Sequence, residues 1–262
     1  MPLANAGDLL MHYDIYGTGP PLVLLMGLGC PAALWWLQIE AFAAHFRVIV
    51  PDNRGVGLTE KPAVEYSTAQ MADDTAHLLE ALGITRAHIL GMSMGGAIAQ
   101  QCALRHPSLV ERLVLACTFS ETSPYGDAIL AIWRTVAERA GMDALSRLLL
   151  LQSVTPRFYN AHPERLAKLC EVFASCPQPV EAYLRQNWAC ARHRTTEQLA
   201  RIVAPTLVLA AERDILTPGG AMKLIHQHIT GSKFIVIPRC GHGFMWEVPD
   251  QFNAAVLEFL TS

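Results

Sequence analysis

"ILGMSMGGAIAQ", residues 89–100, joins an apolar stretch to a glycine-rich one, with a single serine between two methionines. The first half has the character of a buried strand and the second half that of a helix. Gly91, Ser93 and Gly95 thus form a Gly-x-Ser-x-Gly pattern at a strand-to-helix junction, where the pattern marks a nucleophilic serine. Side chains at the glycines would clash with the neighbouring strand and helix. We therefore expect Ser93 to act as a nucleophile rather than as an ordinary turn serine.

Short apolar runs that include this stretch recur along the chain. Runs of nearly continuous apolar character are typical of strands that are buried on both faces of a parallel sheet. The runs cover residues 21–27, 46–52, 87–93, 112–118, 205–214 and 233–240.

Helical patterns separate the runs. Residues 67–83 begin with a capping box formed by Ser67 and Gln70, and residues 94–107 predict a second helix that ends at Pro107. The pattern predicts an α/β fold with helices on both faces of a mostly parallel sheet.

The alternation of strands and helices stops near residue 119 and resumes near residue 204. Between these points the sequence has helical patterns at 126–141, 163–175 and 179–193, and no convincing strand. The length of 262 residues suits one large domain with an insertion better than two equal domains. We therefore expect an α/β core formed by residues 1–120 and 199–262, with an α-helical cap inserted at residues 121–198.

A serine hydroxyl needs a base within hydrogen-bond reach, and that base needs an acid to orient it. His242 lies between two glycines after the last apolar run, and Asp214 ends the run before it. The chain order Ser93, Asp214, His242 is typical of one class of catalytic triad. Glu121, just beyond the run at 112–118, is a rival acid, and the sequence favours Asp214 over it.

Two backbone N–H groups are expected to stabilise the charge that develops on the attacked carbonyl oxygen. Met94, directly after the proposed nucleophile, should supply one of them. Leu28, in the glycine-rich loop after the strand at 21–27, should supply the other.

Two further motifs point to a known family. "PDNRGVGLTEKP", residues 51–62, and "GHGFMWEVPDQF", residues 241–252, accompany the Gly-x-Ser-x-Gly pattern. Together they resemble the α/β-hydrolase superfamily, in its single-domain, helical-capped branch of esterases, lactonases and peroxidase-like hydrolases. The chain departs from the family at Met26, where many members have a histidine. The residues that match the two motifs are Asp52, Arg54, Gly55, Gly57, Thr59, Gly241, His242, Glu247, Pro249 and Phe252.

The resemblance and the triad predict a serine hydrolase that needs no cofactor and cleaves a small carboxylic ester or lactone. An alternative is an enol-lactone hydrolase of the 3-oxoadipate type, which such chains resemble in length and layout. A second alternative is a small-molecule receptor of the same fold, in which slow hydrolysis accompanies signalling. A C–C bond hydrolase or a perhydrolase is less favoured.

Aromatic residues are the candidates for substrate contact, although core packing is the commoner role for each of them. Trp35 follows the expected Leu28 loop, and Trp133, Tyr183 and Trp188 lie in the expected cap. Four further aromatics have similar odds: Trp36, Phe158, Tyr159 and Phe173.

Composition excludes several other classes of function. The chain is 52% hydrophobic and 16% charged, which argues against disorder, and its formal net charge of −3 offers no basic face for nucleic acid or anionic lipid. Residues 1–20 lack the pattern of a signal peptide, so we expect a cytoplasmic protein whose partner is a small molecule. The sequence does not indicate an oligomeric state.

Metal and nucleotide cofactors are not expected either. The seven cysteines are scattered without a CxxC pair, which is typical of reduced thiols. His226 and His228 stand two residues apart at the end of an expected helix, where their side chains point to different sides. No Gly-x-Gly-x-x-Gly fingerprint follows a strand, so the sequence gives no reason to expect a nucleotide.

Overall fold

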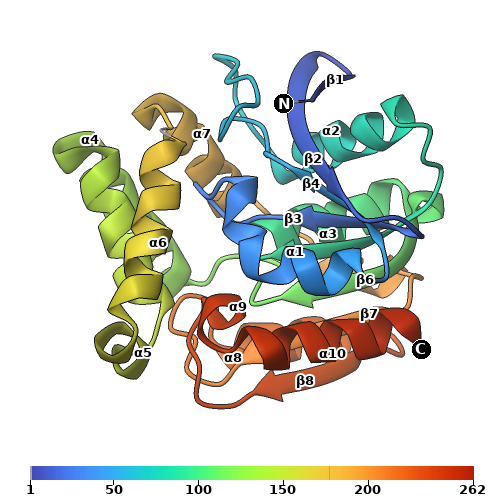
Figure 1. The fold of residues 1–262 in the computed structure, drawn as a ribbon. Coiled ribbons are helices and arrows are strands. Elements are labelled where there is room, and N and C mark those ends of the chain that lie inside the picture. The colour runs from blue at the N-terminus through green and yellow to red at the C-terminus, as the bar shows by residue number, and fades with distance from the viewer. Residues whose placement is uncertain (1, 177) are drawn as a thin grey trace.

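The computed structural model describes residues 2–176 and 178–262, and an eight-stranded sheet forms its centre (Figure 1). The strand order is β1-β2-β4-β3-β5-β6-β7-β8. The pairs β1/β2 and β2/β4 are antiparallel, and the other five pairs are parallel. The strands are β1 Leu3–Ala6, β2 Leu9–Tyr16, β3 Pro21–Leu25, β4 Arg47–Pro51, β5 Ala87–Met92, β6 Val110–Ala116, β7 Thr206–Ala211 and β8 Lys233–Ile237.

Six strands, β3 to β8, overlap the six apolar runs, which confirms the expected mostly parallel α/β sheet. The expectation of burial on both faces is wrong for β8. This strand is at the edge of the sheet, and Ile235 and Val236 are 37% and 47% exposed. The sequence analysis did not identify β1 and β2, because β1 has four residues and β2 carries His12 and Asp14 among its apolar residues.

Helices cover both faces of the sheet and divide the core into two apolar layers. One layer packs against α2, α3 and α8, and the other against α1, α9 and α10. Three short 3₁₀ turns, η1 to η3, join the larger elements. The bounds are η1 Ala32–Trp35, α1 Trp36–Ala43, α2 Thr68–Ala81, α3 Met94–Arg105, η2 Pro107–Leu109, η3 Thr196–Arg201, α8 Gly219–His228, α9 Phe244–Glu247 and α10 Pro249–Thr261.

The two core helices predicted from the sequence are present. The Ser67 side chain caps α2 by accepting a hydrogen bond from the Gln70 backbone N–H at 3.0 Å, which satisfies an N–H that would otherwise lack a partner. Helix α3 ends at Arg105, two residues before Pro107, because proline disfavours helical backbone in the residue before it.

Four helices lie between β6 and β7, to one side of the sheet (Figure 1). The helical patterns expected at 126–141 and 163–175 fall within α4 and α6, and the pattern expected at 179–193 overlaps α7. Its two ends meet, because Glu121 and Arg194 form an isolated β-bridge and the Thr195 N–H donates to the Ser120 carbonyl at 2.8 Å. The bounds are α4 Pro124–Ser153, α5 Pro156–Ala161, α6 Pro163–Ser175 and α7 Val180–Ala191. In the described part of the chain, no helix is long and apolar enough to cross a membrane.

His193 lies where this segment rejoins the sheet, and it is only 2% exposed. Hydrogen bonds join its Nδ1 to the Thr68 hydroxyl at 2.8 Å and its Nε2 to the Thr195 hydroxyl at 3.1 Å. The Thr195 hydroxyl donates to Gln100 Oε1 at 2.7 Å on α3. Burial, with a smaller contribution from the Arg194 charge, lowers the pKa of His193 to about 3. The histidine is therefore neutral in the folded protein.

The low pKa of His193 predicts that stability falls in mild acid. Below pH ~6.5 the unfolded chain binds a proton at this position that the folded chain does not bind until about pH 3. The contribution of His193 to the free energy of unfolding should therefore be fully present above pH ~6.5. As the pH falls below ~6.5, this contribution should decrease by up to ~1.4 kcal/mol per pH unit. Urea unfolding at a series of pH values measures the slope.

His193→Gln should flatten that slope between about pH 6 and pH 4. The matched control is His228→Gln, because His228 is exposed and its Nδ1 contacts only the Leu224 carbonyl of its own helix. Equal slopes in the wild type and His193→Gln would contradict the assignment.

Candidate active site

Ser93 occupies a strained turn between β5 and α3. Its φ of 57° and ψ of −119° are rare for a residue with a side chain and cost roughly 1–3 kcal/mol. The Ser93 N–H donates to the Ala116 carbonyl at 2.9 Å, and the Ser93 carbonyl accepts from the Thr118 hydroxyl at 2.6 Å. Both partners belong to β6 or the residues just after it, so the neighbouring strand holds the turn.

The glycines beside Ser93 are there because the backbone comes too close for a side chain. A Cβ on Gly91 would lie 2.2 Å from the Gly95 carbonyl oxygen, and a Cβ on Gly95 would lie 2.0 Å from the Leu25 carbonyl oxygen on β3. These distances confirm the predicted clashes with helix and strand. The turn can bring β5, α3 and β3 together only while both positions remain glycine.

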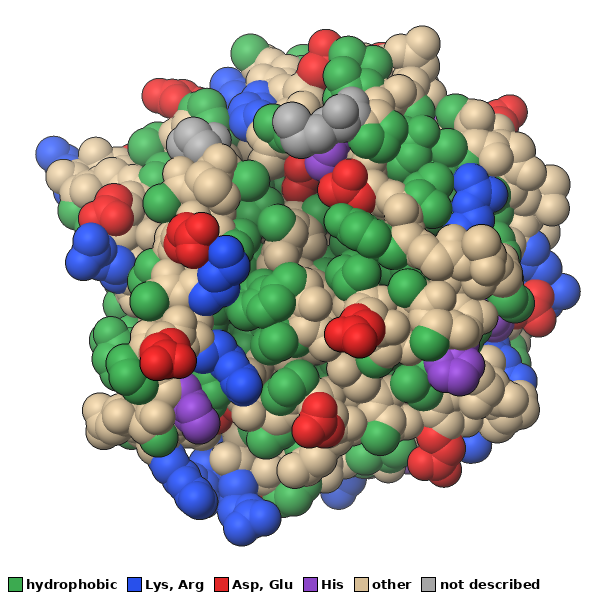
Figure 2. Space-filling model, viewed as in Figure 1, with side chains coloured by type: hydrophobic (Ala, Val, Ile, Leu, Met, Phe, Trp, Pro, Cys, Tyr) green, Lys and Arg blue, Asp and Glu red, His purple; other side chains and the backbone are tan. Residues whose placement is uncertain are grey.

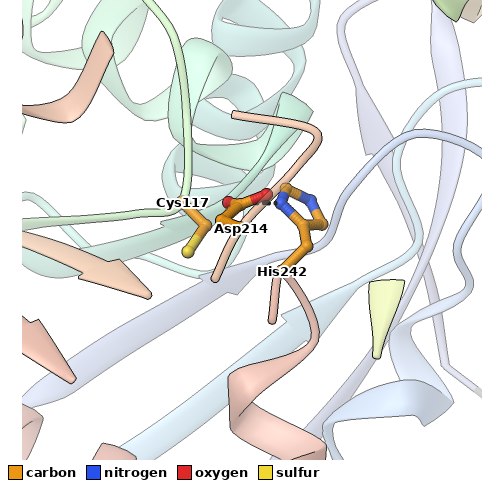
Figure 3. A group of neighbouring side chains, drawn as sticks. All are labelled: Cys117, Asp214 and His242. Carbon is orange, nitrogen blue, oxygen red and sulfur yellow. Dashed lines mark hydrogen bonds and ion pairs between the residues drawn. The ribbon is translucent and has the colours of Figure 1, made fainter. Parts of the chain in front are cut away.

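Asp214 and His242 follow β7 and β8, and their side chains point toward one another (Figure 3). His242 Nδ1 lies 2.8 Å from Asp214 Oδ2. The other carboxylate oxygen accepts from the backbone N–H groups of Leu216 and Thr217 at 2.8 and 3.0 Å, and the Thr217 hydroxyl donates to Oδ2 at 2.5 Å. Because the carboxylate needs a donor, His242 carries its proton on Nδ1 and leaves Nε2 free to accept one.

The electrostatics of Asp214 favour its charged form. Burial alone would raise its pKa, but the positive charge that His242 has when protonated and the hydrogen bonds from His242 and Thr217 outweigh burial and lower it. The side chain is therefore a carboxylate at neutral pH. A buried carboxylate hydrogen-bonded to Nδ1 holds the imidazole in one orientation and stabilises its protonated form.

The rival acid, Glu121, does not occupy the position beside His242 that Asp214 occupies. It is exposed and pairs with Arg194 through the backbone, while Asp214 contacts His242 directly. Ser93 and His242 both line a cavity of about 50 Å³ at the carboxyl ends of the central strands. The structure therefore brings Ser93, Asp214 and His242 to one site, and their roles as a catalytic triad stay a prediction.

The loop after β3 passes directly over Ser93. A Cβ on Gly27 would lie 3.2 Å from the Ser93 Cβ. Leu28 stands in the turn of this loop and Met94 is the first residue of α3, where helix geometry leaves the N–H without an intrahelical partner. Among the described residues neither N–H has an acceptor. Both N–H groups are thus unoccupied in the described residues, and their role in binding an oxygen at Ser93 stays a prediction.

Side-chain amides and a carboxylate hold the loop that begins at Met26. Asn53 Nδ2 donates to the Met26 carbonyl at 2.9 Å, and the Gly29 N–H donates to Gln186 Oε1 at 3.1 Å. The Ala32 N–H donates to Asp52 Oδ1 at 2.7 Å. The sequence analysis missed Asn53 and Gln186, because a single buried amide leaves no periodic or spacing signal.

The sequence of this chain matches a known protein family. A family model described as the alpha/beta hydrolase fold matches residues 20–249. The chain belongs to the α/β-hydrolase fold family. This agrees with the mostly parallel sheet and with the motifs that carried the resemblance.

Relatives and solved structures match this hydrolase over almost its whole length. A protein from Agrobacterium fabrum with the provisional name carbamate hydrolase RutD is 31% identical over 95% of this chain and 98% of its own. A Mycobacterium tuberculosis protein provisionally named non-heme bromoperoxidase BpoC is 32% identical over 96% of this chain and 98% of its own length. The crystal structure of an enol-lactonase from Burkholderia xenovorans LB400 is similar with a TM-score of 0.93 and 29% identity, over 100% of both chains.

Cys117, Asp214 and His242 have potential metal-ligating atoms within 4.8 Å of one another (Figure 3). Their chemistry does not fit a metal. The oxygens of Asp214 already accept four hydrogen bonds, and burial raises the pKa of Cys117 well above that of an ordinary thiol, so that it stays protonated. His226 and His228 also have other partners, the Ser232 hydroxyl and the Leu224 carbonyl.

The four aromatic candidates for substrate contact fall into different environments. Trp133 lines the cavity at Ser93. The others do not line it: Trp35 is fully buried 6.3 Å from the Phe252 ring, Tyr183 is fully buried in the core, and Trp188 is 44% exposed beneath the Arg134 guanidinium. Core packing explains the positions of Trp35 and Tyr183, because a large buried ring contributes apolar contacts to the core. Trp188 instead lies at the surface against the Arg134 guanidinium.

The sequence analysis missed most of the residues that complete the cavity wall. They come from the loop after β3, α4, the loop after β7 and α9, and only their meeting in three dimensions identifies them. They include Cys30, Leu149, Leu150, Ser153, Leu216 and Trp246, whereas Phe173 was among the aromatic candidates.

The elbow packing predicts that Gly95→Ala is strongly destabilising. The added methyl group would meet the Leu25 carbonyl oxygen at 2.0 Å, and overpacking of this kind costs about 1–3 kcal/mol or more. Urea unfolding should show a lower midpoint. The control is Gly220→Ala in the first turn of α8, where nothing lies within 4 Å of the new Cβ and helix propensity favours alanine. A Gly95→Ala midpoint equal to that of the wild type would contradict the packing argument.

Proposed function

We propose that this protein is a serine hydrolase that cleaves a small carboxylic ester or lactone through an acyl-enzyme. The observation that carries the proposal is the 2.8 Å bond between Asp214 and His242 at a cavity that the strained Ser93 also lines. A serine nucleophile, an imidazole base and a buried carboxylate form a catalytic triad for acyl transfer, and the chain order Ser93, Asp214, His242 is typical of one class of such triads.

In the proposed mechanism, Ser93 Oγ attacks the substrate carbonyl carbon while His242 Nε2 takes the hydroxyl proton. The N–H groups of Leu28 and Met94 stabilise the negative oxygen of the tetrahedral intermediate. His242 then donates the proton to the leaving oxygen, and the C–O bond breaks. His242 then takes a proton from water as the water attacks the acyl carbon, and it returns this proton to Ser93 Oγ as the C–O bond to Ser93 breaks, which releases the acid and restores the Ser93 hydroxyl.

We also propose that residues 121–198 form a helical cap on a core of residues 1–120 and 199–262. Two observations support the division. The ends of the segment meet at the Glu121–Arg194 bridge, and the segment contributes Trp133 and Phe173 to the cavity at Ser93. A cap that completes the wall would keep bulk water away from the acyl-enzyme.

A lactone of the enol type is the second candidate substrate. The similarity to the enol-lactonase from Burkholderia xenovorans LB400, over 100% of both chains, favours it. Opening such a ring uses the same attack on a carbonyl carbon, with the enol oxygen as leaving group. A carbamate, which the name of the Agrobacterium fabrum relative suggests, would also present a carbonyl carbon to Ser93.

The triad is tested by Ser93→Ala and Asp214→Asn, with ethyl butyrate as substrate. Ser93→Ala removes the nucleophile, and Asp214→Asn removes the charge that orients His242. Each should lower kcat/KM by about a thousandfold or more. Asp250→Asn is the matched control, since Asp250 is exposed on α10, and it should stay within about twofold of the wild type.

A serine-directed organophosphonate should label Ser93 alone, at one equivalent per chain. Full activity in Ser93→Ala, or labelling at another serine, would contradict the proposal. Multiple turnovers per labelled site distinguish an enzyme from a receptor that hydrolyses its ligand slowly.

A further inference from the structure

Two separate cavities meet at Ser93. The inner chamber, the cavity of about 50 Å³ described above, includes His242, Phe173 and Trp246 in its wall. The outer chamber has a volume of about 90 Å³, and its wall includes Phe119, Ile129 and Cys190. Figure 2 shows apolar side chains gathered near the middle of the face that it presents. The two chambers share four lining residues: Leu28, Ser93, Trp133 and Leu216.

Three of the shared residues have a role in the proposed mechanism or contact a residue that does. Ser93 is the nucleophile, Leu28 supplies an N–H, and Leu216 donates its N–H to Asp214. Trp133 has no role in that mechanism. It comes from α4, it is 7% exposed, and its indole ring forms part of the wall of both chambers.

A hydrogen bond fixes the orientation of the indole. Trp133 Nε1 donates to Gln152 Oε1 at 2.7 Å. In a straight helix the two residues would be roughly 28 Å apart, at about 1.5 Å per residue. They meet because α4 bends sharply at Gly141, whose φ of 80° and ψ of 177° are outside the helical region. The bond therefore ties the two halves of α4 together.

We infer that Trp133 is the partition that divides the substrate site at Ser93, and that Gln152 is a positioning residue that holds it. The inference rests on the proposed function. An ester carbonyl at Ser93 would place its acyl group on one side of the indole and its alcohol group on the other. Gln152 does not line either chamber, so it acts only through Trp133.

The size and polarity of the chambers define the class of substrate. A cavity of roughly 150 Å³ holds one benzene molecule, so each chamber accepts a group of only a few carbon atoms. The walls are mainly apolar, and Glu121 contributes to the outer one. Because a carboxylate on the substrate would have no partner and would be costly to bury in such surroundings, the site favours an uncharged ester with a compact apolar group on each side of the indole.

The test is a ratio of two kcat/KM values, measured for ethyl octanoate and ethyl butyrate on the same preparation, because an ethyl group is small enough for either chamber. The ratio does not depend on the fraction of folded enzyme. The wild type should prefer butyrate. Trp133→Ala joins the chambers and should raise the octanoate-to-butyrate ratio at least about tenfold.

Gln152→Leu leaves the indole in place but removes its acceptor, so the ratio should rise in the same direction by a smaller factor. Trp133→Phe keeps most of the ring, removes the donor, and should also give an intermediate ratio. The matched control is Gln251→Leu, on the exposed side of α10, which should leave the ratio at the wild-type value. Organophosphonate labelling of Ser93 counts the active sites in every preparation.

Two failures can be distinguished. If wild-type Ser93 is labelled and butyrate is turned over, but Trp133→Ala and Trp133→Phe keep the wild-type ratio, the partition is overturned and the proposed function stands. If the wild type neither reacts with the organophosphonate nor hydrolyses either ester, the proposed function fails and the partition fails with it.

Discussion

The close packing of β5 and α3 against β3 is the constraint on which the rest of the site depends. Gly91 and Gly95 let backbone approach backbone at distances that no Cβ could occupy. This contact holds Ser93 at a positive φ, and the bond from the Ser93 N–H to the Ala116 carbonyl fixes the turn from the other side. The strain at Ser93 persists because these contacts leave the backbone no alternative conformation, and it directs the hydroxyl to the end of the sheet.

Parallel strands then bring the other chemical groups to the same edge. Asp214 follows β7, His242 follows β8, and Leu28 follows β3, so that residues far apart in the sequence meet at one end of the sheet. The hydrogen bonds to Asp214 keep it ionised although it is buried. A buried charge that is fully hydrogen-bonded is tolerated, and it orients the imidazole at little further cost in conformational entropy.

The helices between β6 and β7 are coupled to the core through buried polar groups as well as through apolar contacts. Gln186 on α7 accepts from the Gly29 N–H in the loop over Ser93, and it donates to the Arg54 carbonyl at 2.6 Å. His193 joins the end of the same segment to α2. The segment therefore supports the Leu28 loop and also supplies the partition at Trp133. A shift of α7 relative to the sheet would disturb both the proposed N–H donors and the shape of the two chambers.

The sequence by itself determined the alternation of strands and helices, the elbow at Ser93 and the order of Ser93, Asp214 and His242. These features rest on local chemistry: continuous apolar runs, a capping serine at Ser67, and glycines that the turn requires. The N-terminal strands were not predicted from the sequence, because β2 mixes polar and apolar residues. The burial of β8 was overestimated, because an apolar run does not show that a strand lies at the edge of the sheet. Only the tertiary structure decided which aromatic side chains reach the site, because Trp35, Trp133, Tyr183 and Trp188 have similar sequence patterns. The bend at Gly141 brings Trp133 to Gln152 and turns it toward Ser93, and the periodicity of a helix carries no information about where the chain folds back on itself.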